Sequence, residues 1–168
     1  MAAMSDHHLA QVNISRMRLS LDHPEMVEFM ALLDPINALA EGAPGFVWRL
    51  TGEESNDATS VRPFEDDTIM INFSVWASRQ ALWDFVYRSE HLDPLRRRRE
   101  WFTRVADPYL VLWWIPAGHT PTVAEAIERL ELLRREGPTP DAFTFREPFD
   151  ADGLATAETI RGAESAGS

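Results

Sequence analysis

The sequence predicts an α+β protein built on an antiparallel sheet, and three observations support this class. Four short segments are either alternating or almost wholly apolar, as strands are, and two intervening segments carry apolar residues at helical spacing. These six segments follow one another in the order β-α-β-β-α-β. The chain has 168 residues, of which 45% are hydrophobic, and this is enough to form the core of one domain.

The first half of the domain is predicted to hold two strands and a helix. Apolar and polar residues alternate over 9–18, which predicts a strand with one apolar face. A helix over about 24–41 follows, because apolar residues recur at helical spacing after Pro24, an early position where the missing N–H costs nothing. A Pro-Gly turn ends this helix before a short strand over 46–51. Residues 52–66 are acidic and polar and predict a loop.

The second half is predicted to hold two strands, two helices and an arm. The strand over 68–76 has one wholly apolar face, and the strand over 109–115 is almost wholly apolar, as a central strand would be. A helix is expected from a serine cap through to residue 102, over 78–102. A capping box opens a helix over 122–136, and alternating phenylalanines over 142–149 indicate an edge strand or arm.

This order of elements is the ferredoxin-like plan, with an antiparallel four-stranded sheet and two helices on one face. We expect a single domain over 9–149, between a loose leader over 1–8 and a small, polar tail over 150–168. We expect these two helices to pack on the apolar faces of the first and third strands, so no helix of the plan covers the other sheet face. A homodimer that pairs these uncovered faces is therefore predicted, with the arm laid across the partner because a monomer offers its phenylalanines no obvious site.

Composition excludes several classes of function. The chain has no Cys and no Lys, which removes disulfides, thiolate nucleophiles, Schiff-base enzymes and Walker-type phosphate loops. Its formal net charge of -11 argues against a nucleic-acid partner. No long apolar run or signal peptide is present, so we expect a cytoplasmic protein without a membrane partner. No two histidines in the domain have metal-ligand spacing, and we expect neither a metal nor another cofactor.

The faces of the strands indicate where a ligand would bind. The mixed face of the first and third strands interleaves amides and hydroxyls with large apolar groups, which is typical of a small-molecule cavity. A solvent-exposed sheet face is the alternative, but Met70 and Trp76 would be costly to expose. The predicted ligand-binding residues are Asn13, Trp76, Trp48, Met70, Tyr109 and Trp113, and the strand alternation leaves the faces of Trp48 and Trp113 ambiguous.

The predicted second helix carries an additional stripe and a run of arginines. Trp83, Tyr87 and His91 form a stripe apart from the core stripe, which indicates contacts with the C-terminal helix, the arm, a partner or the pocket rim. If the helix continues to Phe102, Arg98 lies among apolar residues and must snorkel, pair with a carboxylate or anchor a ligand anion. Arg98 and His91 are therefore candidate site residues at one end of the sheet.

Several strings in the chain resemble a bacterial family described only as a domain of unknown function, number 3291. These strings are LAQVNISRMR, NFSVWAS, FVYRSEHLDPLRRRREWF and the run from YLVLWWIPAGHT to FTFREPF, which together span about 9–149. That family is similar in turn to the dimeric α/β-barrel group, which includes cofactor-free oxygenases, haem-degrading enzymes, isomerases and polyketide cyclases. The resemblance implies a dimeric α/β barrel, but it implies no particular reaction.

Three functions remain open on these grounds. The first is an enzyme that oxygenates, isomerises or cyclises a largely apolar ring substrate without a metal, with Asn72, His91 and Arg98 as catalytic residues. Histidine suits a proton shuttle because it titrates near neutral pH. The second is a non-catalytic ligand-binding or accessory protein with the same pocket. The third is a dimer scaffold whose pocket is filled by its own aromatic side chains.

Overall fold

The computed structural model describes residues 6–19, 23–51, 68–89, 98–103, 109–151 and 153. Strands and helices alternate along the chain in the order that the sequence predicts, and two short 3-10 helices and a two-residue strand are added to them. The elements are β1 (His7–Met17), η1 (Pro24–Met26), α1 (Val27–Glu41), β2 (Phe46–Arg49), β3 (Ile69–Trp76), α2 (Arg79–Ser89), η2 (Arg98–Glu100), β4 (Phe102–Thr103), β5 (Leu110–Pro116) and α4 (Val123–Glu136).

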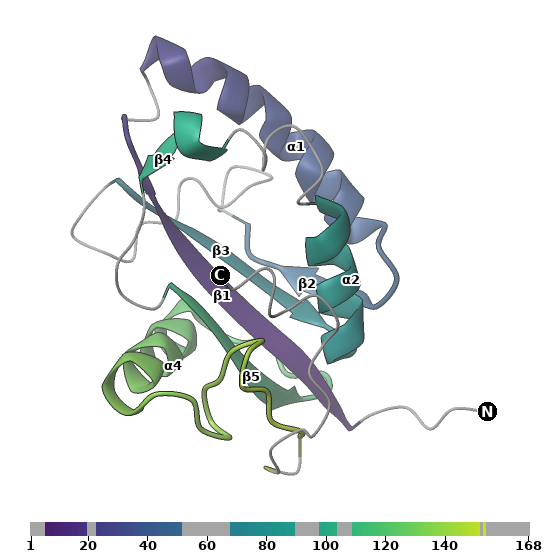
Figure 1. Cartoon of the computed structure of the whole chain (residues 1–168). Coiled ribbons are helices and arrows are strands. Elements are labelled where there is room, and N and C mark those ends of the chain that lie inside the picture. Colours follow the sequence, from purple (N-terminus) through teal and green to yellow (C-terminus); the bar gives the residue numbers. More distant parts are fainter. Residues whose placement is uncertain are drawn as a thin grey trace.

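The strands form one curled antiparallel sheet with β1 at its centre (Figure 1). β3 pairs with one edge of β1, and β2 pairs with the far edge of β3. β5 and the short β4 pair in succession with the other edge of β1. The order β2-β3-β1-β5 is that of a ferredoxin-like sheet, so the predicted α+β fold class is confirmed.

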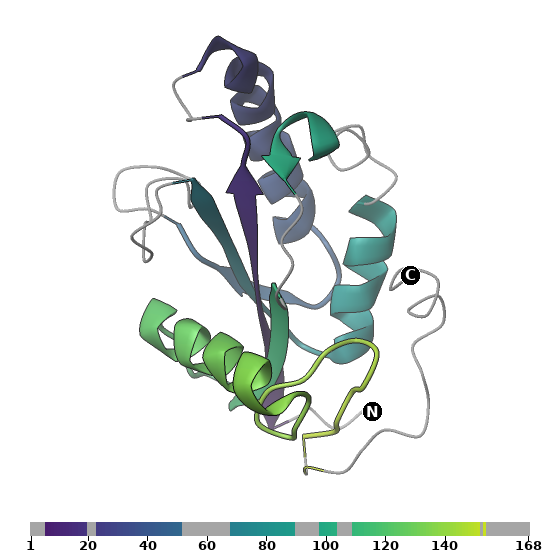
Figure 2. The same ribbon diagram turned by 60° about the vertical axis from the view of Figure 1, so that its left-hand side comes forward.

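Helices lie on both sides of the sheet (Figure 2). The apolar face of β1, β3 and β5 packs against α4 through Ala126, Leu130 and Leu133. The mixed face, which carries Trp76, packs instead against α1 and α2. The expectation that the first two helices cover the apolar face is therefore wrong. Two right-handed crossovers place both helices on one side of the sheet, but this rule does not say which residues of each strand face that side.

The second helix is shorter than the sequence predicts. α2 ends at Ser89, and the chain next described forms a 3-10 turn and the short strand β4, so the predicted continuation of the helix after Pro94 through Phe102 is wrong. β4 pairs with Arg16 and Met17 of β1. Trp101 is buried and its ring lies 5.4 Å from that of Phe29 in α1. These contacts therefore hold the first turn of α1 against the sheet.

The arm after α4 folds back on its own chain. Phe143 exchanges two backbone hydrogen bonds with Leu112 of β5 (2.8 and 2.9 Å), and its side chain is fully buried. The indole nitrogen of Trp114 donates to the carbonyl of Phe149 (2.8 Å), and the ring of Phe145 lies 5.2 Å from that of Trp83. The prediction that a monomer lacks a site for these phenylalanines is wrong, because Phe143 is buried and Phe145 and Phe149 are half-buried against their own chain. The contact between Trp83 and the arm is one of the alternatives predicted for the second stripe of this helix.

Within the described residues, no helix has the length and apolar character required to cross a membrane.

Candidate functional site

A strip of polar side chains lies in the middle of the mixed sheet face. It is built by the register of β1 against β3, in which Asn13 lies opposite Asn72 and Gln11 lies opposite Ser74. Because side chains alternate between faces along a strand, these four residues all project from the same face. We call Gln11, Asn13, Asn72 and Ser74 the amide strip. Leu9 and Trp76, the next pair on this face, close it at one end.

Hydrogen bonds join the amide strip into a chain centred on Gln11. Its Nε2 group donates to Asn72 Oδ1 (3.0 Å) and to Ser74 Oγ (2.7 Å). Its Oε1 atom accepts from Asn13 Nδ2 (3.1 Å). The indole nitrogen of Trp76 donates to Ser74 Oγ (2.8 Å), which connects the aromatic residue to the same chain. Buried polar groups joined in this way hold one another in fixed orientations.

Burial divides the amide strip into a supporting layer and an open layer. Gln11 and Ser74 are 5% and 7% exposed, and Trp76 is 1% exposed. Asn13 is half-buried and Asn72 is exposed, although Asn72 lies in the middle of an interior strand. Its neighbours in the strand, Ile71 and Phe73, face the opposite side and are buried. The helices on this face therefore leave the centre of the sheet uncovered at Asn72.

Two apolar clusters flank the amide strip on the same face. One holds Trp76, Leu9 and Leu82 of α2, with the stacked ring of Phe85 5.1 Å from that of Trp76. The other lies at the opposite end of the strands, where α1, η2 and β4 pack on β1 and β3. This second cluster contains Met17, Met26, Phe29, Trp101 and Met70. Apolar walls around a few fixed polar groups are the arrangement of a site for a small, largely apolar ligand.

The open layer of the amide strip presents both a donor and an acceptor. Asn72 uses Oδ1 to accept from Gln11, and Asn13 uses Nδ2 to donate to it. Among the residues that the structure describes, no hydrogen bond involves Asn72 Nδ2 or Asn13 Oδ1. An amide nitrogen and an amide oxygen on opposite strands are therefore available for a ligand.

The structure separates the predicted ligand-binding residues. Asn13, Asn72, Met70 and Trp76 share the mixed face. Trp48 and Trp113 do not belong with them, because both pack with Phe73 on the apolar face, with ring distances of 5.2 and 5.7 Å. Their placement in the pocket is wrong, since alternation within β2 and β5 could be counted from either neighbouring residue.

The other predicted site residues lie either outside the amide strip or outside the part of the chain that the structure describes. Tyr109 is half exposed and immediately precedes β5. His91 lies outside the described residues. Arg98 begins η2, but its side chain lies outside them as well, and the predicted helix on which its position was based is absent. Gln11 and Ser74 were not predicted as site residues, although their positions on the mixed face could have indicated them.

A separate cluster joins β5 to the start of α4 on the opposite side of the sheet. The buried Trp113 donates its indole N–H to Glu125 Oε2, and His119 Nε2 lies 2.9 Å from Glu125 Oε1. Thr122 caps the helix by accepting from the Glu125 backbone N–H (3.1 Å), as the capping box predicts. Partial burial tends to raise the pKa of the Glu125 carboxyl, but hydrogen bonds from His119 and Trp113, with nearby positive charge, hold that pKa below its ordinary value.

Replacing Glu125 with glutamine is expected to weaken the dependence of stability on acid. A lowered pKa in the folded state stabilises the protein above the unfolded pKa of about 4.5, and this stabilisation is lost as pH falls through the folded pKa. The free energy of urea unfolding, measured between about pH 6 and about pH 3, should therefore fall less in Glu125→Gln than in the wild type. Equal slopes in the two proteins would contradict this account of the cluster.

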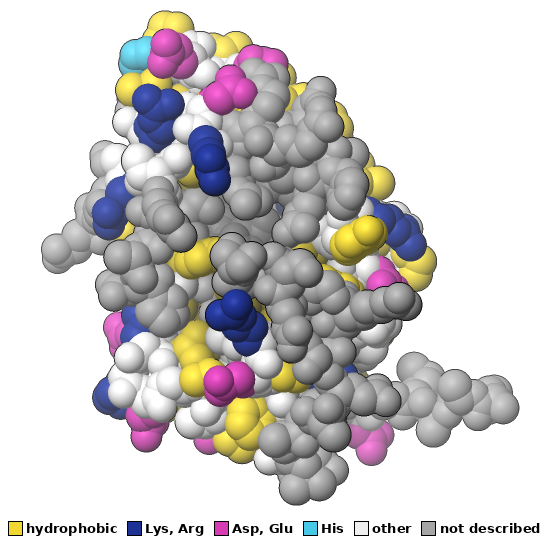
Figure 3. All heavy atoms as spheres, viewed as in Figure 1, with side chains coloured by type: hydrophobic (Ala, Val, Ile, Leu, Met, Phe, Trp, Pro, Cys, Tyr) yellow, Lys and Arg dark blue, Asp and Glu magenta, His cyan; other side chains and the backbone are white. Residues whose placement is uncertain are grey.

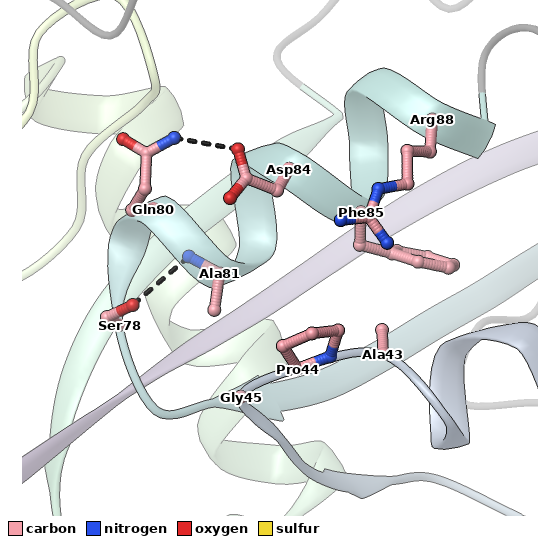
Figure 4. A pocket seen from close by; sticks show the side chains of 9 residues that line it. All are labelled: Ala43, Pro44, Gly45, Ser78, Gln80, Ala81, Asp84, Phe85 and Arg88. Atoms are coloured by element: carbon pink, nitrogen blue, oxygen red, sulfur yellow. Dashed lines mark hydrogen bonds between the residues drawn. The ribbon is translucent and has the colours of Figure 1, made fainter.

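A second feature, which we call the outer cleft, lies between α2 and the turn that joins α1 to β2 (Figure 4). It has a volume of about 310 Å³ and adjoins a second cleft of about 180 Å³ beside the end of α1, with which it shares Ala43, Phe85 and Arg88. Phe85 stands between this cleft and Trp76, so the cleft and the amide strip lie on opposite sides of one aromatic stack.

Described acidic and basic side chains are interspersed on the molecular face in Figure 3, and no large patch of one charge forms there.

The fold defines a class: an α+β domain with a ferredoxin-like sheet, whose mixed face carries the amide strip between two apolar clusters. A family model for a domain of unknown function, DUF3291, matches residues 8–159. The chain belongs to the DUF3291 family. No curated protein matches the chain.

Solved structures with similar chain traces are distant in sequence. SnoaB, a cofactor-independent oxygenase from Streptomyces nogalater, is 18% identical over 67% of this chain and 95% of its own, with a TM-score of 0.44. Rv0793 from Mycobacterium tuberculosis is 16% identical over 68% and 99%, with a TM-score of 0.40. PA3566 from Pseudomonas aeruginosa is 11% identical over 70% and 100%, with a TM-score of 0.40.

Proposed function

We propose that the amide strip binds a small, largely apolar ring compound and that the protein oxygenates, isomerises or cyclises it without a metal. The observation that carries this proposal is the exposed Asn72 amide at the centre of an otherwise covered sheet face, held from below by the buried Gln11. An amide that served only to contact solvent would not need a buried side chain to hold its orientation. Fixed amides between two apolar clusters suit a ligand with apolar rings and one or two polar substituents.

Each residue has a distinct part in this proposal. Asn72 and Asn13 orient the polar substituents of the substrate, and Met70 provides apolar surface at one end of the amide strip. Trp76 is buried at the other end and supports the strip through its hydrogen bond to Ser74. Oriented hydrogen-bond donors lower a reaction barrier when charge develops on a substrate oxygen. His91 moves the proton, because the side chains of the strip do not titrate near neutral pH. Arg98 anchors an anionic group of the substrate at the η2 end.

A non-catalytic ligand-binding or accessory protein is the second candidate. One observation favours it: the described side chains that form the amide strip are amides, a hydroxyl and an indole, none of which is a general base at neutral pH. The two candidates share the binding site and differ only in turnover. A compound that binds and leaves unchanged would support the second candidate.

The substitution Asn72→Ala is expected to weaken binding of ring compounds by about tenfold, which corresponds to the loss of one hydrogen bond. Calorimetric titration with a panel of aromatic polyketide-like and terpenoid compounds measures this change. Gln80→Ala is the matched control, because it removes an amide that bonds to Asp84 on the exposed surface of α2. His91→Ala should leave binding intact and abolish turnover. Unchanged affinity in Asn72→Ala would remove the amide strip as the binding site.

We further propose that the protein is a homodimer paired through the apolar sheet face. α4 packs over β5 and β1 on this face, whereas Trp48, Leu50 and Ile69, toward β2 and β3, are only half-buried. A second copy would complete their burial. Sedimentation at micromolar concentration should give about twice the 19.1 kDa mass of the chain, and Trp48→Glu should reduce it to that of one chain. A wild-type monomer would contradict this assembly.

A further inference from the structure

The orientation of the Gln11 side-chain amide decides what the amide strip offers to a ligand. Both N–H bonds of Gln11 have acceptors, Asn72 Oδ1 and Ser74 Oγ, and its carbonyl oxygen accepts from Asn13. Gln11 is 5% exposed, so water does not readily replace these partners. Because Asn72 Oδ1 is turned toward Gln11, the Asn72 Nδ2 group is turned away from it, on the open side.

The reverse orientation leaves one Gln11 N–H bond without an acceptor. If the Gln11 amide were rotated by half a turn, its oxygen would face Asn72 and Ser74, and both could donate to it. Its nitrogen would then face only Asn13, so one of the two N–H bonds would lack an acceptor. A buried N–H without an acceptor is costly, whereas a carbonyl oxygen that accepts one bond instead of two is tolerated. The orientation seen in the structure pairs every Gln11 group, and the hydrogen left without a described acceptor is that of the Ser74 hydroxyl, which can rotate. The N–H bonds of the planar Gln11 amide cannot rotate in this way, so the orientation seen is the favoured one.

We propose that Gln11 is a positioning residue that fixes Asn72 as a hydrogen-bond donor toward the ligand, so that the site selects ring compounds with a carbonyl or anionic oxygen. The inference rests on the proposed function for its ligand, but not for the orientation of the amides. Gln11 itself lies beneath Asn72 and acts through it. Trp76 belongs to the same unit, because its indole N–H and Gln11 Nε2 both donate to Ser74 Oγ.

The substitution Gln11→Glu reverses the polarity with little change of shape. A carboxylate at position 11 accepts hydrogen bonds and donates none. Asn13 can donate to it as before, the Ser74 hydroxyl can donate while still accepting from Trp76, and Asn72 must turn its Nδ2 group inward. Asn72 Oδ1 then faces the ligand. The change converts the site from a donor to an acceptor without altering any residue of the open layer.

Two measurements test the proposal, and the first needs no ligand. Hydrogen exchange of the side-chain amides, followed by NMR on isotope-labelled protein, should show slow exchange at Gln11 Nε2 and fast exchange at Asn72 Nδ2. In Gln11→Glu the Asn72 amide should become protected. Fast exchange at Gln11 with slow exchange at Asn72 in the wild type would overturn the proposal.

The second measurement compares two bicyclic probes of similar size, indanone, which only accepts hydrogen bonds, and indole, which only donates. The wild type should prefer indanone by about tenfold, and Gln11→Glu should prefer indole. Gln80→Glu, which makes the same charge change on the surface, should keep the wild-type preference. An unchanged preference in Gln11→Glu would overturn the positioning role, because loss of packing alone would weaken both probes together.

Failure of the proposed function has a different signature. If neither probe bound the wild type while the amides exchanged as expected, the ligand would be wrong and the orientation would stand. Should Gln11→Glu fail to fold, Asn72→Asp provides the test, because its carboxylate still accepts from Gln11 and presents an oxygen in place of Nδ2. It should lose indanone affinity by about tenfold. Retained affinity for indanone in Asn72→Asp would overturn the proposal.

Discussion

Replacing Phe143 with alanine is expected to lower the free energy of unfolding by about 3–5 kcal/mol, the usual cost of removing a buried phenylalanine ring. The side chain of Phe143 is fully buried, in the cluster that contains Leu9, Leu112 and Trp76. Its backbone bonds to Leu112 survive the substitution, so the loss reports on the ring alone. Urea unfolding measures the change.

Phe145→Ala is the matched control for this prediction. Phe145 belongs to the same arm but is only half-buried, and its ring contacts that of Trp83 at 5.2 Å. Its substitution should cost less than half as much as Phe143→Ala, because much less apolar surface is removed from the interior. If Phe143→Ala were no more destabilising than Phe145→Ala, the arm would not pack on its own chain as described.

The substitution Gly45→Ala is expected to cost about 2–5 kcal/mol, because a left-handed backbone strains a residue with a Cβ and overpacking adds to that strain. Gly45 has a φ of 84°, and a Cβ at this position would overlap the Cβ of Ala81 in α2. The carbonyl of Gly45 also accepts from the Ala77 backbone N–H (2.7 Å). The turn before β2 therefore cannot withdraw from α2 without losing this bond.

Gly118→Ala separates the two contributions. Gly118 has a similar φ of 92°, but nothing lies within 4 Å of the position that a Cβ would occupy. This variant should lose only the backbone term, about 1–2 kcal/mol. Adding Ala81→Gly to Gly45→Ala should recover part of the stability, since it removes the overlapping methyl group. Equal losses in Gly45→Ala and Gly118→Ala would show that the turn does not press against α2.

Alternation and helical spacing were sufficient to predict most of the elements and the shared face of the two asparagines. The alternating run that became β1 and the apolar face of β3 predicted that Asn13 and Asn72 lie on the mixed faces of two strands. The capping box at Thr122 predicted the start of α4 to within a residue. These signals are local, and each depends on residues a few positions apart in the chain.

The side of the sheet that each helix covers could not be predicted in the same way. The apolar face attracts a helix, but the sequence carries three helices for two faces, and α4 takes the apolar one. The mixed face was expected to lack helices because it carries polar residues. Those residues satisfy one another through hydrogen bonds between strands, so α1 and α2 can pack on this face. The sheet faces of Trp48 and Trp113 were predicted wrongly for a related reason. Their strands are short, so the alternation could be counted from either of two neighbouring residues.

The supporting role of Gln11 could not be predicted from the sequence. In the sequence it is one of several polar residues in a strand, with nothing to distinguish it from Asn13. Only the register of β1 against β3 brings its amide between Asn72 and Ser74 and buries it. The supporting layer of a site depends on contacts between strands, in this case between residues 61 and 63 positions apart.

The central claim is that the amide strip holds a ring compound, with an acceptor oxygen at Asn72. A crystal structure of the protein soaked with indanone tests it most directly. We expect the ring to lie on the mixed sheet face over the open layer of the amide strip, beside Met70, with its carbonyl oxygen within hydrogen-bonding distance of Asn72 Nδ2. Indanone bound instead in the outer cleft beside Phe85 and Arg88, with the amide strip unchanged, would contradict it.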